Sequence, residues 1–134
     1  MSIEQYNKFR KEFMGKYYTP MSNKDWQRIK SNSCVIEIKD DKNDEKIIGL
    51  AVISIADSLT RRAMVIEDII VDKDYRRKGI AKDIINSILK MAKSYDTDCI
   101  EVATKINNKP AQALYKKFGF INRKQTSYRL WVKK

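Results

Sequence analysis

The chain of 134 residues contains no histidine, two cysteines, two prolines and four glycines. The lack of histidine excludes Ser-His and Cys-His nucleophile pairs, an imidazole base and most zinc or iron sites. Any proton transfer must therefore use a carboxylate, tyrosine, lysine, cysteine or water. Cys34 and Cys99 lie far apart and form no CxxC pair, so they indicate neither a disulfide framework nor a zinc site. We expect no bound metal.

The sequence also lacks an apolar run that could cross a bilayer, since runs such as IIGLAVISIA reach about half the required length. The N-terminal segment MSIEQYNKFRKEF has no signal-peptide pattern either. No repeat or linker interrupts the chain, and 43% of its residues are hydrophobic, which predicts one domain over residues 1–134. We expect a cytoplasmic protein without a membrane partner.

Positive charge is in excess, with 28 lysines and arginines against 17 acidic residues and a net charge of +11. Long-range attraction favours polyanionic partners such as nucleic acid, a phosphorylated cofactor or an acidic surface. A lysine-rich, solvated surface without any such partner explains the same charge. A nucleic-acid partner therefore stays open, as does a homodimer.

Hydrophobic spacing in the first half predicts two helices followed by three strands. Tyr6, Phe9 and Phe13 recur at helical spacing, and SNKDWQRIKSN predicts a second helix with Ser22 as its cap. The β-branched runs CVIEIK, KIIGLAVISIA and AMVIEDIIV are separated by polar segments. These runs predict an antiparallel meander.

The second half adds a parallel strand and a last helix. After Gly79, isoleucines mark one face of a helix that ends near Lys93, and CIEVAT follows as a short strand. A strand-helix-strand order predicts a parallel pair. NNKPAQALYKKFGF predicts a helix capped by Asn108 and ended at Gly119, and the alternating SYRLWVKK predicts a final hairpin arm. These elements predict an α/β fold class, with a mixed, mostly antiparallel central sheet and flanking helices.

The stretch VDKDYRRKGIA joins the third strand to the next helix. A helix that starts at Gly79 leaves its first amides unpaired, and their partial positive charge favours a phosphate or another anion. Gly79 allows close approach of the backbone because it has no Cβ. A basic turn ahead of a helix is also typical of plain solvated surface, so the position between a strand and a helix is what favours an anion site.

Two motifs resemble those of the GNAT superfamily of N-acetyltransferases. VDKDYRRKGIA is similar to the family's acetyl-CoA signature Q/R-x-x-G-x-G/A through Arg76, Gly79 and Ala81. NKPAQALYKKFGF is similar to its N-x-x-A-x-x-L-Y-x-x-x-G-F motif through Asn108, Ala111, Leu114, Tyr115, Gly119 and Phe120. The resemblance runs from Ile47 to about Val132 and implies a GNAT-like sheet with a splayed parallel pair. Because the chain starts in a helix, the first strand usual in the family is expected to be missing.

The resemblance implies that acetyl-CoA binds as the acetyl donor. It assigns the pyrophosphate to the amides of Arg77, Lys78, Gly79, Ile80 and Ala81. Charge attraction at the phosphates comes from Arg76, Arg77 and Lys78. The pantetheine arm would lie along Ile69, Ile70 and Val71, with hydrogen bonds to Ile69 and Val71, and Asn108 would contact the arm from the other side.

The resemblance also implies two catalytic residues. Tyr115 occupies the general-acid position beside the cofactor, where a phenol that is protonated at neutral pH can donate a proton to the departing thiolate. Glu67 stands where many relatives carry an acidic residue that takes the proton of the amine. A salt-bridge role for Glu67, with water as the base, stays open. A regular strand would turn Asp68 to the opposite face.

These features predict an acyltransferase that moves the acetyl group of acetyl-CoA to a primary amine of a small molecule or protein by direct attack in a ternary complex. One alternative is a nucleic-acid-associated enzyme that acts on aminoacyl-tRNA. Another is a CoA-binding module without catalysis, which the presence of Tyr115 disfavours. No motif identifies the acceptor.

Overall fold

The computed structural model describes residues 2–133, the side chains of residues 44 and 45 excepted. The chain forms two compact units, one ending at Ala103 and the other beginning at Thr104. Each unit is described by itself below. Among residues 2–133, no helix combines the length and the apolar composition needed to span a bilayer.

Two helices begin the first unit, as the spacing of apolar residues predicts. Helix α1 covers Ile3–Met14, continues into the 3-10 turn η1 at Gly15–Tyr17, and is followed by α2 at Asn23–Asn32. Ser2 and Ser22 cap the two helices, each with its side-chain oxygen accepting a backbone N–H three residues on. These caps satisfy amides that the first turn of a helix leaves without a partner.

The sheet of the first unit has four strands in the order β1-β2-β3-β4. They are β1 (Cys34–Asp40), β2 (Asn43–Asp57), β3 (Arg62–Val71) and β4 (Cys99–Val102). β1, β2 and β3 form an antiparallel meander, and β3 pairs in parallel with β4. The 3-10 turn η2 (Lys73–Tyr75) and helix α3 (Ile80–Ser94) connect the parallel strands. The predicted α/β fold with a mixed sheet is therefore confirmed.

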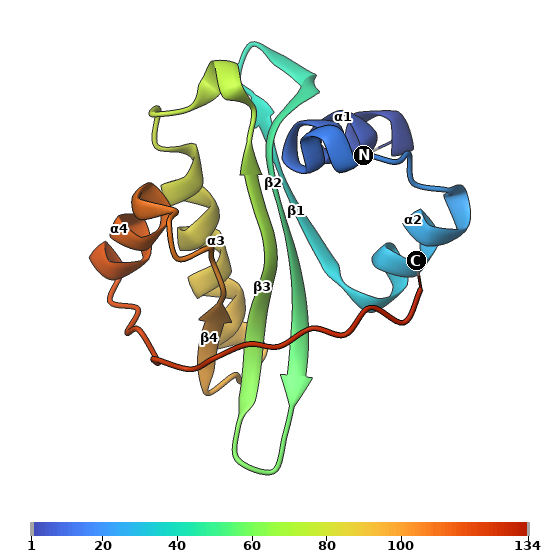
Figure 1. Cartoon of the computed structure of the whole chain (residues 1–134). Coiled ribbons are helices and arrows are strands. Elements are labelled where there is room, and N and C mark those ends of the chain that lie inside the picture. Colours follow the sequence, from blue (N-terminus) through green and yellow to red (C-terminus); the bar gives the residue numbers. More distant parts are fainter. Residues whose placement is uncertain (1, 134) are drawn as a thin grey trace. The chain divides into compact units, whose positions relative to one another are not determined.

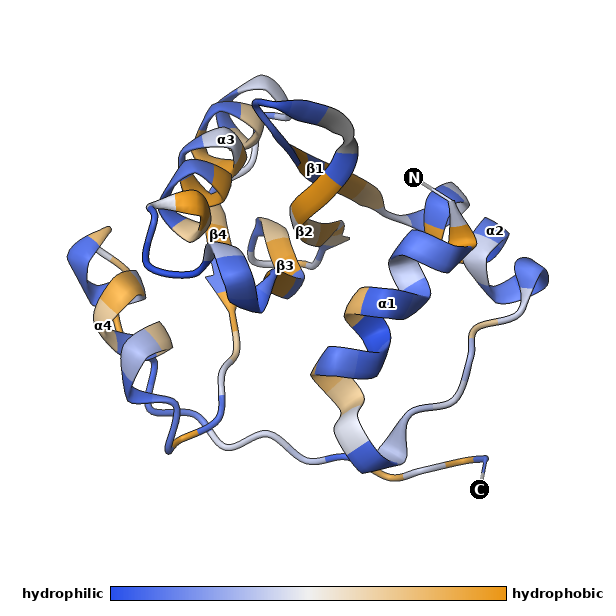
Figure 2. Cartoon of the chain, turned by 90° about the horizontal axis from the view of Figure 1, so that it is seen from above, coloured by the Kyte–Doolittle hydropathy of each residue, from blue (hydrophilic) through white to orange (hydrophobic). Residues whose placement is uncertain are grey.

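Helices cover both faces of this sheet, with α3 on one side and α1 and α2 on the other (Figures 1 and 2). On the α3 face, the helix buries Ile84, Ile85 and Ile88 completely. On the other face, hereafter the α1/α2 face, Tyr6, Phe9 and Trp26 pack against a cluster that includes Leu50 and Val52. The side chains of β2 thus alternate between two cores, as a central strand requires.

Gly49 sets how closely α3 approaches the sheet. A Cβ at this position would lie 3.0 Å from Cγ2 of Ile80 and 3.4 Å from Cδ1 of Ile84. Ile80 is the first residue of α3, so the helix start depends on this contact. We expect Gly49→Ala to lower the free energy of unfolding, measured in urea, by about 1–3 kcal/mol through overpacking. The cost should be smaller in an Ile80→Ala background, and an equal cost in both backgrounds would exclude this contact as the cause.

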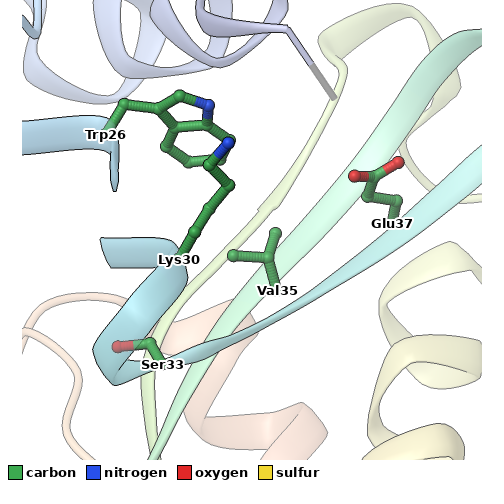
Figure 3. A pocket seen from close by; sticks show the side chains of 5 residues that line it. All are labelled: Trp26, Lys30, Ser33, Val35 and Glu37. Atoms are coloured by element: carbon green, nitrogen blue, oxygen red, sulfur yellow. The ribbon is translucent and has the colours of Figure 1, made fainter. Parts of the chain in front are cut away.

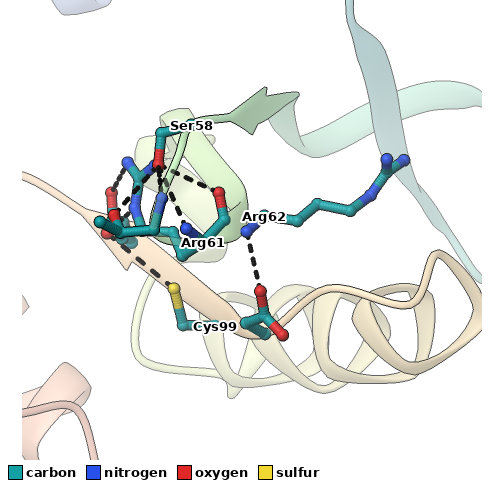
Figure 4. A network of polar contacts seen from close by, with 7 residues as sticks. Ser58, Arg61, Arg62 and Cys99 are labelled. Atoms are coloured by element: carbon teal, nitrogen blue, oxygen red, sulfur yellow. Dashed lines mark hydrogen bonds and ion pairs between the residues drawn. The ribbon is translucent and has the colours of Figure 1, made fainter.

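A polar network fixes β4 against the start of β3 (Figure 4). The guanidinium of Arg61 donates to both carboxylate oxygens of Glu101 at 2.9 Å and also donates to Ser58 Oγ. The backbone N–H of Arg62 donates to the Asp98 carboxylate at 2.8 Å, and the Asp98 N–H donates to the Arg62 carbonyl oxygen at 2.8 Å. These contacts hold the parallel pair together at this end of the strands.

The second unit contains helix α4 (Lys109–Lys117), which Asn108 caps. Gly119 follows the helix in a left-handed conformation, with φ of 92°. The Phe120 N–H donates to the Tyr115 carbonyl oxygen, which closes the helix end. The predicted hairpin arm is wrong, because no strand is formed between residues 121 and 133 and Tyr128, Leu130 and Val132 are exposed. Alternation predicts which side chains share a face, but a strand also needs a partner.

Candidate active site

The parallel pair β3–β4 separates halfway along β3. Its last paired residues are Ile66 and Val102, whereas β3 continues to Val71. The Asp72 N–H donates to the Ile48 carbonyl oxygen of β2 at 2.8 Å. Because peptide groups alternate in direction along a strand, those of Ile69 and Val71 point away from β2, toward the side on which β4 has diverged. An extended ligand could add to β3 at this edge.

A turn with two left-handed residues follows this open edge of β3. Arg77 has φ of 62° and Gly79 has φ of 81°. Turns with left-handed residues can aim successive amides into one concavity, which binds anions. Gly79 is also the N-cap of α3 and provides no capping side chain, so the first amides of the helix are unpaired. A Cβ at Gly79 would meet no atom within 4 Å, so the space beside this residue is open.

The cationic side chains of the turn differ in the contacts that they already make. Arg76 donates from Nη2 to Glu12 on α1 and from Nε to the Val71 carbonyl oxygen. Arg77 and Lys78 are exposed, and the Lys78 amine lies 5.2 Å from the centre of the Tyr75 ring. Arg76 therefore fixes α1 and the strand end to the turn, while Arg77 and Lys78 are available to an anion.

Asp72, between β3 and the turn, is buried and joins the turn to α1. Its carboxylate accepts a hydrogen bond from the Lys8 amine at 3.2 Å and another from the Asp74 N–H at 3.0 Å. Burial alone would raise the pKa of Asp72, but these hydrogen bonds and the Lys8 charge hold it below its ordinary value. Together with the Glu12–Arg76 pair, this contact attaches α1 to the turn at two points.

A β-bulge in β3 places two carboxylates on one face of the sheet. Val52 of β2 lies opposite Asp68, but the next residue, Ile53, lies opposite Ile66, so Glu67 is an extra residue. Val52 packs in the core of the α1/α2 face, and Asp68 therefore faces the same side. Glu67 accepts a hydrogen bond of 2.7 Å from Ser54, which follows Val52 by two residues and shares its face. The expectation that Asp68 points opposite to Glu67 is wrong, because the strand is irregular there.

Asp68, which a regular strand would turn away from Glu67, lies in a more buried environment than Glu67. Burial raises the pKa of its carboxyl, the neighbouring charge of Glu67 raises it further, and Arg10 on α1 opposes them. Tyr6, also on α1, has a raised pKa because it is buried and because Asp68 is negative. The two carboxylates differ in environment, since Asp68 is half-buried and Glu67 is exposed. A carboxyl whose pKa is perturbed by burial together with a neighbouring charge is a candidate for a functional residue.

The second unit carries the other two residues singled out by sequence. Tyr115 lies on α4, and the centre of its ring is 5.6 Å from the centre of the Phe120 ring. Burial raises the pKa of the Tyr115 hydroxyl. It is thus protonated at neutral pH and able to donate. The Asn108 side-chain oxygen accepts from the Ala111 N–H at 3.2 Å, so its oxygen caps α4. Ile70, in the first unit, faces the α1/α2 core and pairs with Leu50.

A pocket of about 290 Å³ opens between α2 and β1, lined by Trp26, Lys30, Ser33, Val35 and Glu37 (Figure 3). The Lys30 amine lies 5.3 Å from the centre of the Trp26 ring. Val35 pairs with Val52, which in turn lies opposite Asp68. The ring centres of Tyr6 and Trp26 lie 4.7 Å apart, and both residues pack with Val52 in one core cluster. Trp26 therefore belongs both to the lining of the pocket and to the core cluster that contains Val52.

Comparisons with known sequences agree on one family. The family model described as acetyltransferase (GNAT) family matches residues 3–120. N-acetyltransferase 8 of Homo sapiens is 27% identical over 94 residues, which are 69% of this chain and 41% of that protein. An N-alpha-acetyltransferase of Saccharolobus solfataricus is 39% identical over 64 residues, which are 47% of this chain and 38% of that protein. The chain thus matches less than half the length of either relative.

Solved structures show the same fold. A probable acetyltransferase superposes with a TM-score of 0.81 at 21% identity, over 98% of this chain and 93% of that one. AAC(6')-Iy, in complex with a bisubstrate analog that contains CoA, has a TM-score of 0.78 at 19% identity, over 96% and 90%. Glucosamine-6-phosphate N-acetyltransferase from Arabidopsis thaliana has a TM-score of 0.74 at 21% identity, over 99% and 95%.

Proposed function

The chain belongs to the acetyltransferase (GNAT) family, and on that premise we propose that it transfers the acetyl group of acetyl-CoA to a primary amine by direct attack in a ternary complex. The observation that carries the proposal is the open edge of β3, which leads directly into the left-handed turn at Gly79. Acetyl-CoA combines an extended pantetheine arm with a pyrophosphate, and the edge and the turn suit these two parts in that order.

The residues of the first unit fit this ligand. Ile69 and Val71 offer peptide groups to the pantetheine amides, because β4 pairs with β3 only as far as Ile66. The amides of residues 77–81 surround the pyrophosphate, with Arg77 and Lys78 adding charge. Arg76 acts chiefly through Glu12 and Val71, by holding the strand end and the turn in place.

Tyr115 and Asn108 complete the proposal from the second unit. Tyr115 donates its hydroxyl proton to the departing thiolate, and Asn108 contacts the pantetheine arm through its side-chain amide group. Two facts support these roles: the match of the family model extends through both residues, and the Tyr115 hydroxyl is protonated at neutral pH. Acetyl-CoA supplies the activated thioester, so the protein must position the amine, move protons and stabilise charge.

An assay of thiol release over a panel of primary amines tests this function. The panel holds diamines, amino sugars, peptides with free N-termini, lysine peptides and aminoacyl-tRNA, each supplied with acetyl-CoA. We expect thiol release with at least one amine, matched by a mass increase of one acetyl group on that amine. Product on aminoacyl-tRNA alone would identify the nucleic-acid-associated alternative. CoA binding without release over the whole panel would favour a binding module and contradict the proposal.

A further inference from the structure

We propose that Asp68, rather than Glu67, is the carboxylate that accepts the proton of the acceptor amine. This inference rests on the proposed acetyl transfer and assigns its base. The bulge at Glu67 places Asp68 on the α1/α2 face, immediately beyond Ile66, where β4 separates from β3. The base and the open strand edge therefore lie next to each other on β3.

Glu67 and Asp68 differ in what holds them. One carboxylate oxygen of Glu67 accepts a hydrogen bond from the Ser54 hydroxyl at 2.7 Å, and the Glu67 side chain is exposed to solvent. The Asp68 side chain, by contrast, accepts no hydrogen bond from any described residue. A half-buried carboxylate without a donor is available to accept a proton from a substrate. Glu67 instead acts on Asp68 through its charge, which Ser54 keeps close by.

The groups that face Asp68 favour its role as a base. Glu67 acts from the same strand, and Arg10 and Tyr6 act from α1. The opposite residue on β2, Val52, is apolar. Burial and Glu67 raise the pKa of Asp68, and Arg10 lowers it by a smaller effect. The net effect raises the pKa of the Asp68 carboxyl toward neutral pH. A general base is most efficient when its pKa lies near the operating pH. Arg10 is itself held by the Thr19 carbonyl oxygen at 2.8 Å.

The proton transfers balance over the reaction. An N–H bond of the acceptor ammonium breaks and an O–H bond forms on Asp68, which leaves a neutral amine. The amine lone pair forms the C–N bond to the thioester carbon, and the carbonyl electrons move to oxygen. The oxygen electrons then re-form the carbonyl as the C–S bond breaks, and the electron pair of that bond leaves with sulfur, which gains one proton from Tyr115. The second proton of the amine restores Tyr115 through water, and Asp68 releases its proton to solvent.

A titration of the isolated protein tests the predicted environment of the Asp68 carboxyl without cofactor or acceptor. The ¹³C shift of the Asp68 side-chain carboxyl, followed against pH by NMR, should give a midpoint above the ordinary value of 3.8. In Glu67→Gln the midpoint should fall, because the like charge that raises it is gone. A midpoint at or below the ordinary value in the wild type would overturn the proposal.

Kinetics then test the role itself. Asp68→Asn should lower kcat/KM about a hundredfold or more and remove the acidic limb of its pH profile. Glu67→Gln should keep that limb but move it to lower pH, since activity is lost as Asp68 becomes protonated. The matched control is Asp57→Asn, an exposed aspartate near the start of the β2–β3 loop, which should keep both rate and profile.

The outcomes separate this inference from the proposed function. If the wild type transfers acetyl to an amine and Asp68→Asn keeps the acidic limb, Asp68 is not the base. If the wild type transfers acetyl to no amine, the proposed function fails and the assignment of the base fails with it. CoA affinity and the thermal midpoint of Asp68→Asn should stay near those of the wild type, because the change is nearly isosteric and lies on the α1/α2 face, away from the turn at Gly79.

Discussion

Tyr115→Phe should lower turnover by about a hundredfold or more, the usual effect of losing a positioned acid. The phenylalanine ring keeps the contact with Phe120, which lies 5.6 Å away between ring centres, so the fold should be unaffected. CoA affinity should hardly change, since the hydroxyl acts on sulfur only as the C–S bond breaks. Rapid-mixing measurements of a single turnover would follow the chemical step without product release.

The control for this variant is Tyr128→Phe, which removes a hydroxyl from an exposed tyrosine of the same unit. It should leave single-turnover rates unchanged. Wild-type turnover in Tyr115→Phe, measured where chemistry limits the rate, would make Tyr115 a packing residue of α4.

Gly79→Val should weaken CoA binding by roughly a hundredfold. A valine strains the left-handed conformation of the turn, where φ is 81°, and projects into the space that the pyrophosphate would fill. Loss of two charge-assisted hydrogen bonds to phosphate, at about 1.5 kcal/mol each, accounts for that factor. Isothermal calorimetry with CoA measures it directly, without an acceptor.

Backbone strain alone needs a separate control, because it also reduces stability. Gly15→Ala supplies it, since Gly15 has φ of 56°, no atom within 4 Å of an added Cβ, and a position outside both family motifs. This variant should lose thermal stability but keep its affinity for CoA. If folded Gly79→Val binds CoA as tightly as the wild type, the pyrophosphate does not lie at this turn.

The fold of the first unit could be predicted because its elements have clear periodicities. Tyr6 and Phe9 recur at helical spacing and are buried, and the isoleucines of α3 occupy one face that is completely covered. Strand order followed from the connections, since a strand, a helix and a strand in succession favour a parallel pair. The arm after Phe120 has equally good alternation, yet its residues are exposed and unpaired with any described strand. Its pairing depends on a partner that local spacing does not encode.

The left-handed turn of the candidate site could be predicted from its glycine, whereas the face on which Asp68 lies could not, because a bulge decides it. Gly79 marks the turn because only glycine adopts its conformation at low cost. The bulge at Glu67 has no such marker, and one inserted residue reverses the face of Asp68. Arg76 was expected at the phosphates, but Glu12, distant in sequence, lies beside it. That pairing depends on how α1 packs, which the motif does not contain.

Amide hydrogen exchange with and without CoA tests the central claim most directly, because it needs neither an acceptor nor a variant. The account predicts that CoA slows exchange at Ile69, Val71 and the amides of residues 77–81, while β1 and the pocket at Trp26 and Lys30 are unaffected. Unchanged exchange along β3 and the turn at saturating CoA, or protection confined to other elements, would contradict it.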